Sequence, residues 1–280
     1  MTKVVLITGA SSGFGLLTTI TLARRGWRVL ATMRDLSRRE KLEAAAQAAG
    51  VLDHIEFLTL DVTNSEQIAA LAETLAERQV HALVNNAGFA MAGFTEDIAD
   101  AELRKQFETN FFGAAAVTRA FLPQMRRQGS GHIVMLSSIS GRVGFPGIGS
   151  YVASKHALEG WTETLRMEMK PLGIHVVLVE PGSFQTDIWT RNAAISIGTL
   201  NALSPNANRV ARWRKRIEDG KPKANPQIVA DGIATILENP RPKLRYVFGR
   251  DASFALLLRR LLPWSAFERL LIKASGIKEQ

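Results

Sequence analysis

The 280-residue sequence contains no cysteine, which excludes disulfide bonds, thiolate metal ligands and a cysteine nucleophile. Its histidines show no His-x-x-x-His or similar ligand spacing, so we expect no catalytic metal; they are His54, His81, His132, His156 and His175. No apolar run reaches the roughly 18–20 residues of a membrane-spanning helix, and a glycine-rich segment interrupts the first apolar run, which argues against a signal peptide. We therefore expect a cytoplasmic protein with one α/β domain around a single large core.

Positive charge is unevenly distributed along the chain. Residues 1–208 contain 19 Lys and Arg and 19 Asp and Glu, a balance of zero, whereas residues 209–280 contain 16 and 7, which accounts for the whole net charge of +9. A basic C-terminal quarter is compatible with nucleic acid as a partner. Within Phe254–Ile272, leucines lie between the basic side chains. They form no glycine-spaced aromatic platform on which bases could stack, so we expect no nucleic-acid partner.

Apolar runs typical of buried strands alternate with helical patterns along the chain. The expected strands are Lys3–Thr8, Arg28–Met33, Ile55–Leu60, Ala82–Asn85, Ile133–Ser137, Ile174–Glu180 and Leu244–Phe248, and the expected helices include Arg38–Ala49, Ser65–Arg78, Ala101–Arg127, Tyr151–Lys170 and Gln227–Glu238. This alternation predicts a doubly wound, mostly parallel, seven-stranded Rossmann sheet with helices on both faces. Ligands of such sheets bind beyond the carboxyl ends of the strands.

A glycine-rich turn follows the first expected strand. It runs Gly9-Ala-Ser-Ser-Gly13-Phe-Gly15 and leads into a helical pattern over Leu16–Arg25, which is the strand–turn–helix context of a dinucleotide site. Gly9 would permit the tight turn, Gly13 the close approach of a pyrophosphate, and Gly15 the packing of helix on strand. The helix N-terminus would offer N–H groups and the positive end of its dipole to the phosphates.

Tyr151 and Lys155 stand four positions apart on an expected helix, so both side chains can point into one pocket. A free tyrosine has a pKa of about 10, and an adjacent lysine cation would lower it toward neutrality. Ser138, at the end of the apolar run Ile133–Leu136, can donate a hydrogen bond to a substrate oxygen. By itself the Tyr-x-x-x-Lys spacing is common, and it gains meaning only together with the glycine turn. These groups transfer protons and not hydride, so a cofactor is required.

Several motifs resemble, in order and spacing, those of the short-chain dehydrogenase/reductase family in its short, single-domain subclass. They are Thr8-Gly-Ala-Ser-Ser-Gly-Phe-Gly15, Asn85-Asn-Ala-Gly88, Ser138, Tyr151-x-x-x-Lys155 and Pro181-Gly-x-x-x-Thr186, and the similarity extends from residue 3 to about residue 250. Ala31-Thr-Met-Arg34-Asp and Tyr246-Val-Phe-Gly249-Arg-Asp-Ala resemble the hydroxysteroid and retinol dehydrogenase branch. The resemblance implies an oxidoreductase with one Rossmann domain over residues 1–250.

The resemblance implies a role for each of four catalytic residues. Tyr151 would be the general acid and base, and Lys155 would lower the pKa of Tyr151 and bind the nicotinamide ribose. Ser138 would polarise the substrate carbonyl, and Asn110 would hold a water in a proton relay towards Lys155. Ser137 is the neighbouring alternative to Ser138, and the spacing in the family favours Ser138.

The resemblance also implies which residues surround the cofactor and the substrate. Besides Tyr151 and Lys155, the expected cofactor residues are Gly9, Ser11, Ser12, Gly13, Phe14, Gly15, Arg34, Asp61, Val62, Asn86, Ala87, Gly88, Pro181, Gly182 and Thr186. Asp61 and Val62 would contact the adenine, and Thr186 would bond the nicotinamide carboxamide. The expected substrate residues are Ser138, Ile139, Phe145, Ile148, Tyr151, Ser183 and Phe184. Most of them are apolar, which favours a hydrophobic ketone, aldehyde or alcohol over a sugar.

The end of the second expected strand decides between the two nicotinamide dinucleotides. Relatives that prefer NAD place an acidic residue there to accept a hydrogen bond from the ribose 2′-OH, whereas this chain has Met33 followed by Arg34, with Arg38 and Arg39 nearby. A guanidinium can bind a 2′-phosphate through paired, charge-assisted hydrogen bonds. We therefore expect NADP(H), and NAD(H) is the alternative because Asp35 follows Arg34.

Two segments leave alternatives open. Residues 187–225 are expected to form a substrate lid, or else a long surface loop; they include Trp189, Ile195, Ile197, Trp213 and a basic cluster over Arg209–Arg216. Residues 251–280 are expected to form a basic, amphipathic extension of two short helices broken at Pro263. Its apolar stripe would pack on the enzyme or on another subunit, or contact a membrane peripherally.

The sequence thus predicts an NADP(H)-dependent oxidoreductase that interconverts a hydrophobic ketone or aldehyde and its alcohol. The alternative from another class is a dinucleotide-sensing regulator without turnover, against which the presence of Ser138, Tyr151 and Lys155 argues. The alternative within the class is an NAD-dependent alcohol dehydrogenase. By resemblance, a homodimer or homotetramer would form through the helices that contain Asn110 and Tyr151.

Overall fold

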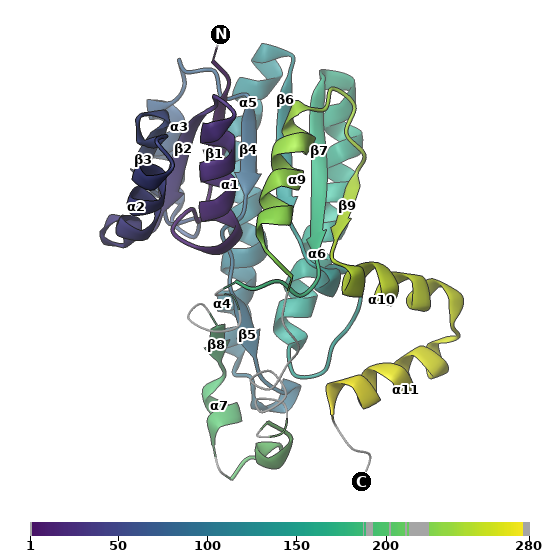
Figure 1. Ribbon diagram of the computed structural model, residues 1–280. Helices are drawn as coiled ribbons and strands as arrows, with labels where there is room; N and C mark the ends of the chain where they lie inside the picture. Colours follow the sequence, from purple (N-terminus) through teal and green to yellow (C-terminus); the bar gives the residue numbers. More distant parts are fainter. Residues whose placement is uncertain are drawn as a thin grey trace.

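Seven parallel strands form the central sheet of the computed structural model, which describes residues 2–186, 188, 193–201, 203–210, 212 and 224–276. The strands are β1 (Val4–Ile7), β2 (Arg28–Met33), β3 (Ile55–Thr59), β4 (Ala82–Asn85), β6 (Gly131–Leu136), β7 (Ile174–Pro181) and β9 (Arg245–Phe248). Their order is β3-β2-β1-β4-β6-β7-β9, so the chain changes direction across the sheet between β1 and β4. This arrangement confirms the predicted fold class (Figure 1).

Helices cover both faces of this sheet, as Figure 1 shows. One face carries α1 (Gly13–Arg24), α2 (Glu40–Ala48) and α9 (Gln227–Glu238), and the other carries α3 (Ser65–Thr74), α5 (Ala114–Gln128) and α6 (Gly149–Met169). Successive strand residues point to opposite faces, so Val5 and Ile7 belong to the first apolar layer and Leu6 to the second. These two layers fix the positions of the strand ends, from which the connecting loops emerge.

The helix predicted over residues 101–127 is interrupted. The structure has α4 (Asp100–Phe107), a π-helical turn η4 (Glu108–Gly113) and then α5. Such turns occur frequently at functional sites, and this one contains Asn110. The prediction of a continuous helix is wrong because apolar periodicity does not reveal a local insertion in the ladder of backbone hydrogen bonds. The helix predicted to reach residue 78 likewise ends earlier, with α3.

The region predicted as a lid, residues 187–225, is described in part. Its strand β8 (Ala193–Ile195) pairs with β5 (Ala90–Ala92), and α7 (Ile197–Leu200) follows. Trp189, Trp213 and most of the basic cluster over Arg209–Arg216 lie outside the described residues. The remaining short elements are η1 (Leu36–Arg39), η2 (Leu52–His54), η3 (Thr95–Asp97), η5 (Ile139–Gly141) and η6 (Lys170–Leu172).

Hydrogen bonds to acidic side chains hold residues 196–206 of this region on the body of the protein. Ser204 Oγ donates to Asp97 Oδ1 at 2.7 Å, and Asn206 Nδ2 donates to Glu96 Oε1 at 2.7 Å. Ser196 Oγ donates to Glu102 Oε2 at 2.7 Å. The segment around α7 is therefore tied to η3 and α4.

The C-terminal extension consists of α10 (Arg250–Leu261) and α11 (Trp264–Ser275), which meet at Pro263 as predicted. Their inner faces pack on the body, because Ala252 and Phe267 form a buried cluster with Ile139 and Val143. The packing alternative is thereby confirmed for this side of the extension.

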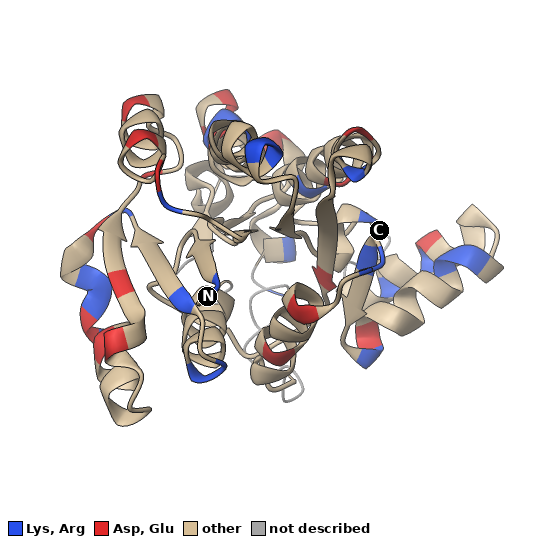
Figure 2. Cartoon of the chain, turned by 90° about the horizontal axis from the view of Figure 1, so that it is seen from above, with Lys and Arg blue, Asp and Glu red and all other residues tan. Residues whose placement is uncertain are grey.

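The outer side of the extension leaves apolar side chains in solvent. The exposed large apolar residues of the extension are Phe254, Leu257, Leu261, Trp264 and Leu270. Figure 2 shows α10 and α11 projecting from the sheet with several Lys and Arg residues among them. In the described part of the chain, no helix has the length and apolar character needed to cross a membrane.

Phe267→Ala should lower the free energy of unfolding by about 3–5 kcal/mol, because the ring is 2% exposed and its loss leaves a cavity. Phe254→Ala removes the same group from the outer side of the extension, where the ring is 60% exposed, and should change the free energy by less than about 0.5 kcal/mol. Urea unfolding of both variants tests this, and equal losses would contradict the packing described here.

Candidate active site

A cavity of about 870 Å³ lies at the carboxyl ends of the strands, where doubly wound sheets bind their ligands. Loops after β1, β2, β3, β4, β6 and β7 form its walls together with α10 and α11. All predicted cofactor and substrate residues line this cavity except Gly15, and the predicted catalytic residues line it except Asn110. The volume lies within the range of small-molecule and cofactor sites.

The glycine turn between β1 and α1 forms one end of the cavity. Gly9 and Gly13 have φ angles of +69° and +55°, which residues with a side chain rarely adopt. The N-terminus of α1 therefore directs its N–H groups at the cavity, as a phosphate site requires. Gly15 lies in the first turn of α1, where a Cβ would overlap the Asn86 amide and the Gly9 carbonyl. It therefore permits the close approach of the helix to the ends of β1 and β4, in keeping with its predicted packing role, but it does not line the cavity.

Asn86 and Thr8 join the loop after β4 to the glycine turn. Asn86 Nδ2 donates to the carbonyl oxygens of Thr8 and Gly9, both at 2.9 Å. In return, the Thr8 hydroxyl accepts from the backbone N–H groups of Asn86 and Ala87, both at 3.0 Å. These four bonds lie at the point where the sheet order reverses, so they fix the position of the glycine turn relative to β4.

Ser138 and Tyr151 meet in the wall of the cavity. Ser138 follows β6, and its hydroxyl accepts from the backbone N–H of Ser140 at 3.1 Å, which fixes its orientation at the start of η5. Tyr151 comes from the first turns of α6, is 4% exposed and is hydrogen-bonded to Ser138. Ser137 also lines the cavity, but it lies beside Glu159. The structure therefore brings Ser138, and not its neighbour, to the phenol.

Lys155 lies one turn after Tyr151 on α6 and is buried. Its Nζ donates to the Leu136 carbonyl oxygen at 2.6 Å and lies 5.8 Å from the centroid of the Tyr151 ring. Burial lowers the pKa of Lys155 to about 8, and the Glu159 carboxylate partly offsets this effect. The end of β6 thus holds the ammonium group beside the aromatic ring.

The expected lowering of the Tyr151 pKa is wrong for this structure. Burial raises the pKa of Tyr151 to about 12, and the hydrogen bond from Ser138 offsets only part of that rise. The physical reason is desolvation, because a phenolate at a site 4% exposed loses the stabilisation that water provides. The phenol is therefore held in its protonated form near neutral pH.

Asn110 does not line the cavity but lies directly behind its wall. Its Nδ2 donates to the Phe89 carbonyl oxygen at 3.0 Å and to Ser154 Oγ at 3.2 Å, and its Oδ1 accepts from the Phe89 N–H at 3.1 Å. The side chain therefore fastens η4 to the loop after β4 and to α6. The expected role in a water relay towards Lys155 stays a prediction.

Two arginines flank the part of the cavity that follows β2. Arg34 and Arg38 line it together with Asp35. Asp35 Oδ1 accepts from the Ser37 N–H at 2.9 Å, and its other oxygen lies 3.9 Å from Arg38 Nε. Hydrogen bonding to Ser37 lowers the pKa of Asp35. The carboxylate is thus engaged in the local turn at η1.

The opposite part of the cavity is mostly apolar, and the C-terminal extension contributes to it. Sequence reasoning placed Ile139, Phe145, Ile148, Ser183 and Phe184 here, and all of them line the cavity. It missed a group of small and apolar residues that also line it: Pro146, Ile188, Ala194, Ala252, Ala255, Leu271 and Ala274. The amphipathic pattern of residues 251–276 was the available signal, but periodicity does not reveal what an apolar face covers.

Asp251 is a further residue that sequence reasoning missed. Its Oδ2 accepts from the Ser183 N–H at 2.7 Å, and a Cβ at Gly182 would overlap this carboxylate. The start of α10 therefore fixes the loop after β7. Phe184 of this loop packs edge-on against Phe14 with ring centroids 5.7 Å apart, which ties the same loop to the glycine turn.

Comparison with known proteins shows the family. The model described as short chain dehydrogenase matches residues 3–195. The uncharacterized oxidoreductase YusZ of Bacillus subtilis is 41% identical over 97% of this chain and 98% of its own. Human 17-beta-hydroxysteroid dehydrogenase type 1 is 35% identical, covering 92% of this chain and 80% of its own, and human retinol dehydrogenase 8 is 36% identical, covering 87% and 80%. The chain therefore belongs to the short-chain dehydrogenase/reductase family of oxidoreductases, and its likeness to the hydroxysteroid and retinol dehydrogenase branch is confirmed.

Solved structures agree with this assignment. A short-chain dehydrogenase from Streptomyces avermitilis has a TM-score of 0.82 at 34% identity and covers both chains completely. A Burkholderia cenocepacia short chain dehydrogenase in complex with NADP has a TM-score of 0.76 at 25% identity, covering 96% of this chain and 98% of its own. A Burkholderia phymatum relative in complex with NAD has a TM-score of 0.77 at 27% identity, covering 92% and 93%. Similar folds in the family thus bind either dinucleotide.

Proposed function

We propose that this protein is an NADPH-dependent carbonyl reductase that converts a hydrophobic ketone or aldehyde to its alcohol. The observation that carries the proposal is the arrangement of three side chains in the cavity wall. Ser138 is bonded to the Tyr151 phenol, and Lys155 Nζ lies 5.8 Å from the centroid of the same ring. The glycine turn lines the same cavity, so a dinucleotide and a carbonyl compound can meet there.

The residues of the chain would bind and orient the reactants and supply a proton. Ser138 would donate a hydrogen bond to the carbonyl oxygen, and Tyr151 would transfer its phenolic proton to that oxygen as negative charge develops there. A reduced nicotinamide, when bound, supplies the hydride for the carbonyl carbon. Lys155 would stabilise the phenolate that remains, until the phenol regains a proton from solvent.

The ionisation states support reduction near neutral pH. With a pKa of about 12, Tyr151 keeps its proton, and a pKa of about 8 leaves Lys155 mostly cationic at pH 7. A protonated phenol can give a proton to a developing alkoxide, whereas oxidation of an alcohol requires the phenolate as a base. These protonation states agree with the reductive direction that we propose for the site.

Tyr151→Phe should lower the rate of ketone reduction by about 10²–10⁴-fold, the typical contribution of a positioned acid, and should leave NADPH binding nearly unchanged. A panel of ketones and aldehydes, followed through the absorbance of NADPH, measures the rate, and fluorescence titration measures binding.

The matched control is Tyr246→Phe, because Tyr246 is the other of two tyrosines in the chain and does not line the cavity. Turnover by Tyr151→Phe at the wild-type rate would refute the assignment of the acid. Dinucleotide binding by the wild type with no turnover across the panel would favour the regulator instead.

For the dinucleotide we infer a preference for NADP(H) over NAD(H). Arg34 and Arg38 line the cavity after β2, where the adenosine ribose of a dinucleotide lies in this fold. An acidic residue such as Asp35 favours NAD(H), but the Asp35 carboxylate already accepts a hydrogen bond from the Ser37 N–H and lies near Arg38. It is therefore poorly placed to accept from a ribose hydroxyl, whereas a 2′-phosphate would find two guanidinium groups.

Arg34→Ala should raise the KM for NADPH by about 10–100-fold, since hydrogen bonds to charged groups contribute about 1.5–3 kcal/mol. The KM for NADH should change by less than about threefold, because NADH carries no 2′-phosphate. Steady-state kinetics with both dinucleotides test this. Arg39→Ala is the control, because Arg39 pairs with Glu43 at 3.2 Å and does not line the cavity. Equal effects of Arg34→Ala on both dinucleotides would contradict the preference.

We also propose that residues 187–225 cover the substrate, since Ile188 and Ala194 line the cavity and β8 pairs with β5.

Pairing of subunits through α4–α5 and α6 stays a prediction. Exposed apolar side chains on these elements, Phe112 and Met167, support it.

For the outer side of the C-terminal extension we propose an anionic lipid surface as the partner. Phe254, Leu257 and Leu261 recur every three or four residues, so they share one face of α10. Exposed arginines, including Arg250 and Arg260, flank this face. A basic rim around an apolar stripe complements anionic lipid, whereas two copies of this face would bring like charges together.

The double variant Phe254→Ser/Leu257→Ser should abolish co-sedimentation with vesicles that contain phosphatidylglycerol, whereas the wild type should sediment with them and not with pure phosphatidylcholine. Ile228→Ser, which changes an exposed apolar residue on α9, is the control and should sediment like the wild type. Failure of the wild type to bind, or a dimer that depends on Phe254 and Leu257 in sedimentation velocity, would contradict a lipid partner.

A further inference from the structure

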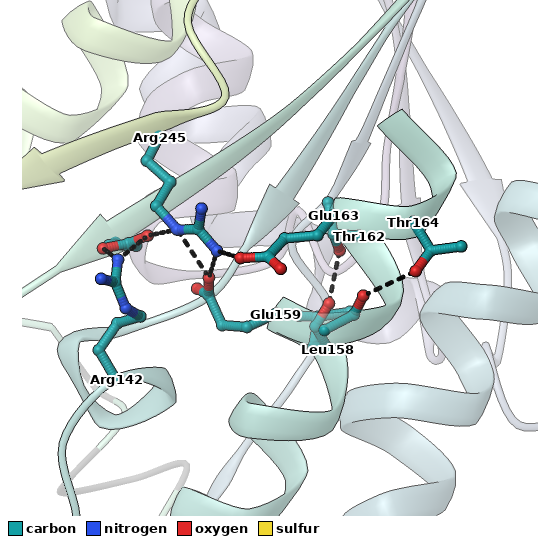
Figure 3. A network of polar contacts seen from close by, with 9 residues as sticks. Arg142, Leu158, Glu159, Thr162, Glu163, Thr164 and Arg245 are labelled. Atoms are coloured by element: carbon teal, nitrogen blue, oxygen red, sulfur yellow. Dashed lines mark hydrogen bonds and ion pairs between the residues drawn. The ribbon is translucent and has the colours of Figure 1, made fainter. Parts of the chain in front are cut away.

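A network of charged side chains, in which Glu159 and Glu180 are buried, lies behind the wall of the cavity. Figure 3 shows the Arg245 guanidinium between the carboxylates of Glu159 and Glu163. Arg245 Nε also pairs with Glu180 at 2.8 Å, and Arg142 Nη1 approaches Glu180 at 3.4 Å. Three carboxylates and two guanidinium groups therefore share one site, where taking each charge out of water is unfavourable.

The network connects α6, which carries Tyr151 and Lys155, with neighbouring elements of the sheet and with the segment after Ser138. Glu159 and Glu163 belong to α6, Glu180 to the end of strand β7 and Arg245 to β9, while Arg142 directly follows η5. Pro181, next to Glu180, lines the cavity, and η5 begins directly after Ser138. The charged residues thus lie close to residues of the cavity wall but do not themselves line the cavity.

Glu159 is the member of this network closest in position to Lys155. It lies four residues further along α6, so the two side chains share a face of the helix, and both are buried, at 4% and 6% exposure. Glu159 Oε2 accepts from Arg245 Nε and Nη2 at 3.2 and 3.1 Å. A Cβ at Gly141 would come within 3.2 Å of its other oxygen, Oε1, so the turn of η5 closes over the carboxylate.

In the described part of the chain, each element that packs around Glu159 contributes a charged or polar neighbour. Glu180 faces it from β7, Arg245 from β9 and Arg142 from the segment after η5, while Glu163 lies one turn further on α6. The Ser137 hydroxyl at the end of β6 lies beside the carboxylate. Among these groups, Glu159 is the one whose charge acts on Lys155.

We propose that Glu159 is a positioning residue that acts through Lys155, by holding the buried ammonium group in its protonated form beside the phenol of Tyr151. The proposal deepens the function assigned above and rests on it for its kinetic consequence. Burial raises the pKa of Glu159, and the ion pairs with Arg245 act against that rise because they favour the charged carboxylate. The network thus supports a negative charge that opposes the effect of desolvation on the Lys155 ammonium group.

The sign of the effect follows from charge. Glu159→Gln removes one negative charge close to the ammonium group, so the proton of Lys155 should dissociate at lower pH. In the wild type that pKa is about 8, and the variant should titrate roughly one pH unit lower. Because reduction requires the protonated pair, the high-pH decline of the reductive rate should move down by the same amount.

The primary test is an NMR titration of the ligand-free protein with 13Cε-labelled lysine, in which Lys155 is assigned by the signal missing from Lys155→Met. Glu159→Gln should shift the Lys155 midpoint down by roughly one pH unit, and Glu159→Asp, which keeps the charge, should return it toward the wild-type value. Glu163→Gln is the matched control: it removes a carboxylate from the same arginine at a position 50% exposed, and should leave the midpoint unchanged.

Glu159→Gln/Arg245→Gln removes the carboxylate and its paired guanidinium together, so the test remains available if the single variant does not fold. The double variant should also shift the midpoint downward, because it removes Glu159, the charged neighbour that raises the pKa of Lys155. The proposal would be overturned if the Lys155 midpoint were unchanged in Glu159→Gln and in Glu159→Gln/Arg245→Gln. It would also be overturned if Glu163→Gln shifted the midpoint as much as Glu159→Gln.

The kinetic test uses the ketone that the wild type reduces fastest. At pH values well below the high-pH decline, the reductive rate of Glu159→Gln should match that of the wild type within about threefold. One pH unit above the new Lys155 midpoint, the rate of the variant should have fallen by about tenfold. A loss by the same factor at every pH would indicate a merely structural role and would overturn the proposal. Because the NMR midpoint does not depend on turnover, failure of the proposed reductase activity would be distinguishable from failure of this inference.

Discussion

The cavity depends first on the bonds between the ends of β1 and β4. Asn86 bridges two carbonyl oxygens of the glycine turn, and the Thr8 hydroxyl accepts two N–H groups in return. Buried backbone groups left without partners are unfavourable by about 1–3 kcal/mol each, so these bonds make the turn a rigid part of the sheet. Gly15 is required here because a side chain would displace the Asn86 amide. The orientation of the α1 N-terminus follows from this joint.

Burial determines the chemistry at the other end of the cavity. The same low-polarity surroundings raise the pKa of Tyr151 and lower that of Lys155, so both groups are displaced toward their neutral forms. The main-chain oxygen of Leu136 and the charge of Glu159 act against this tendency at the lysine. The result is a protonated phenol, which burial favours, next to an ammonium group that Leu136 and Glu159 stabilise against the effect of burial.

Much of this arrangement could be predicted from the sequence. The strands lie where apolar runs indicated, and α9 has the predicted bounds, because the pattern of apolar residues reflects burial directly. Motif residues such as Ser138, Tyr151 and Arg34 line one cavity because each follows a strand or begins the next helix. These parts of the site depend on local order and on sheet topology, both of which leave a signal in the chain.

Other parts could not be predicted, because they depend on contacts between distant segments. The π-helical turn contains Asn110, whose side chain bonds to Phe89 and Ser154 on other elements, and no periodicity in the sequence indicates this turn. The pKa of Tyr151 was expected to fall on account of its neighbour, whereas the depth of burial, which spacing does not report, decides its direction. Glu159 and Arg245 are 86 residues apart and meet only in the folded chain.

The two helices after Gly249 contribute wall residues to the apolar part of the cavity, although they stand outside the sheet and carry neither Ser138, Tyr151 nor Lys155. Part of the cavity lining is therefore supplied by a segment at the end of the polypeptide. In the function proposed above, exchange of this tail between homologous enzymes would alter part of the surface that meets the substrate and leave those three residues in place.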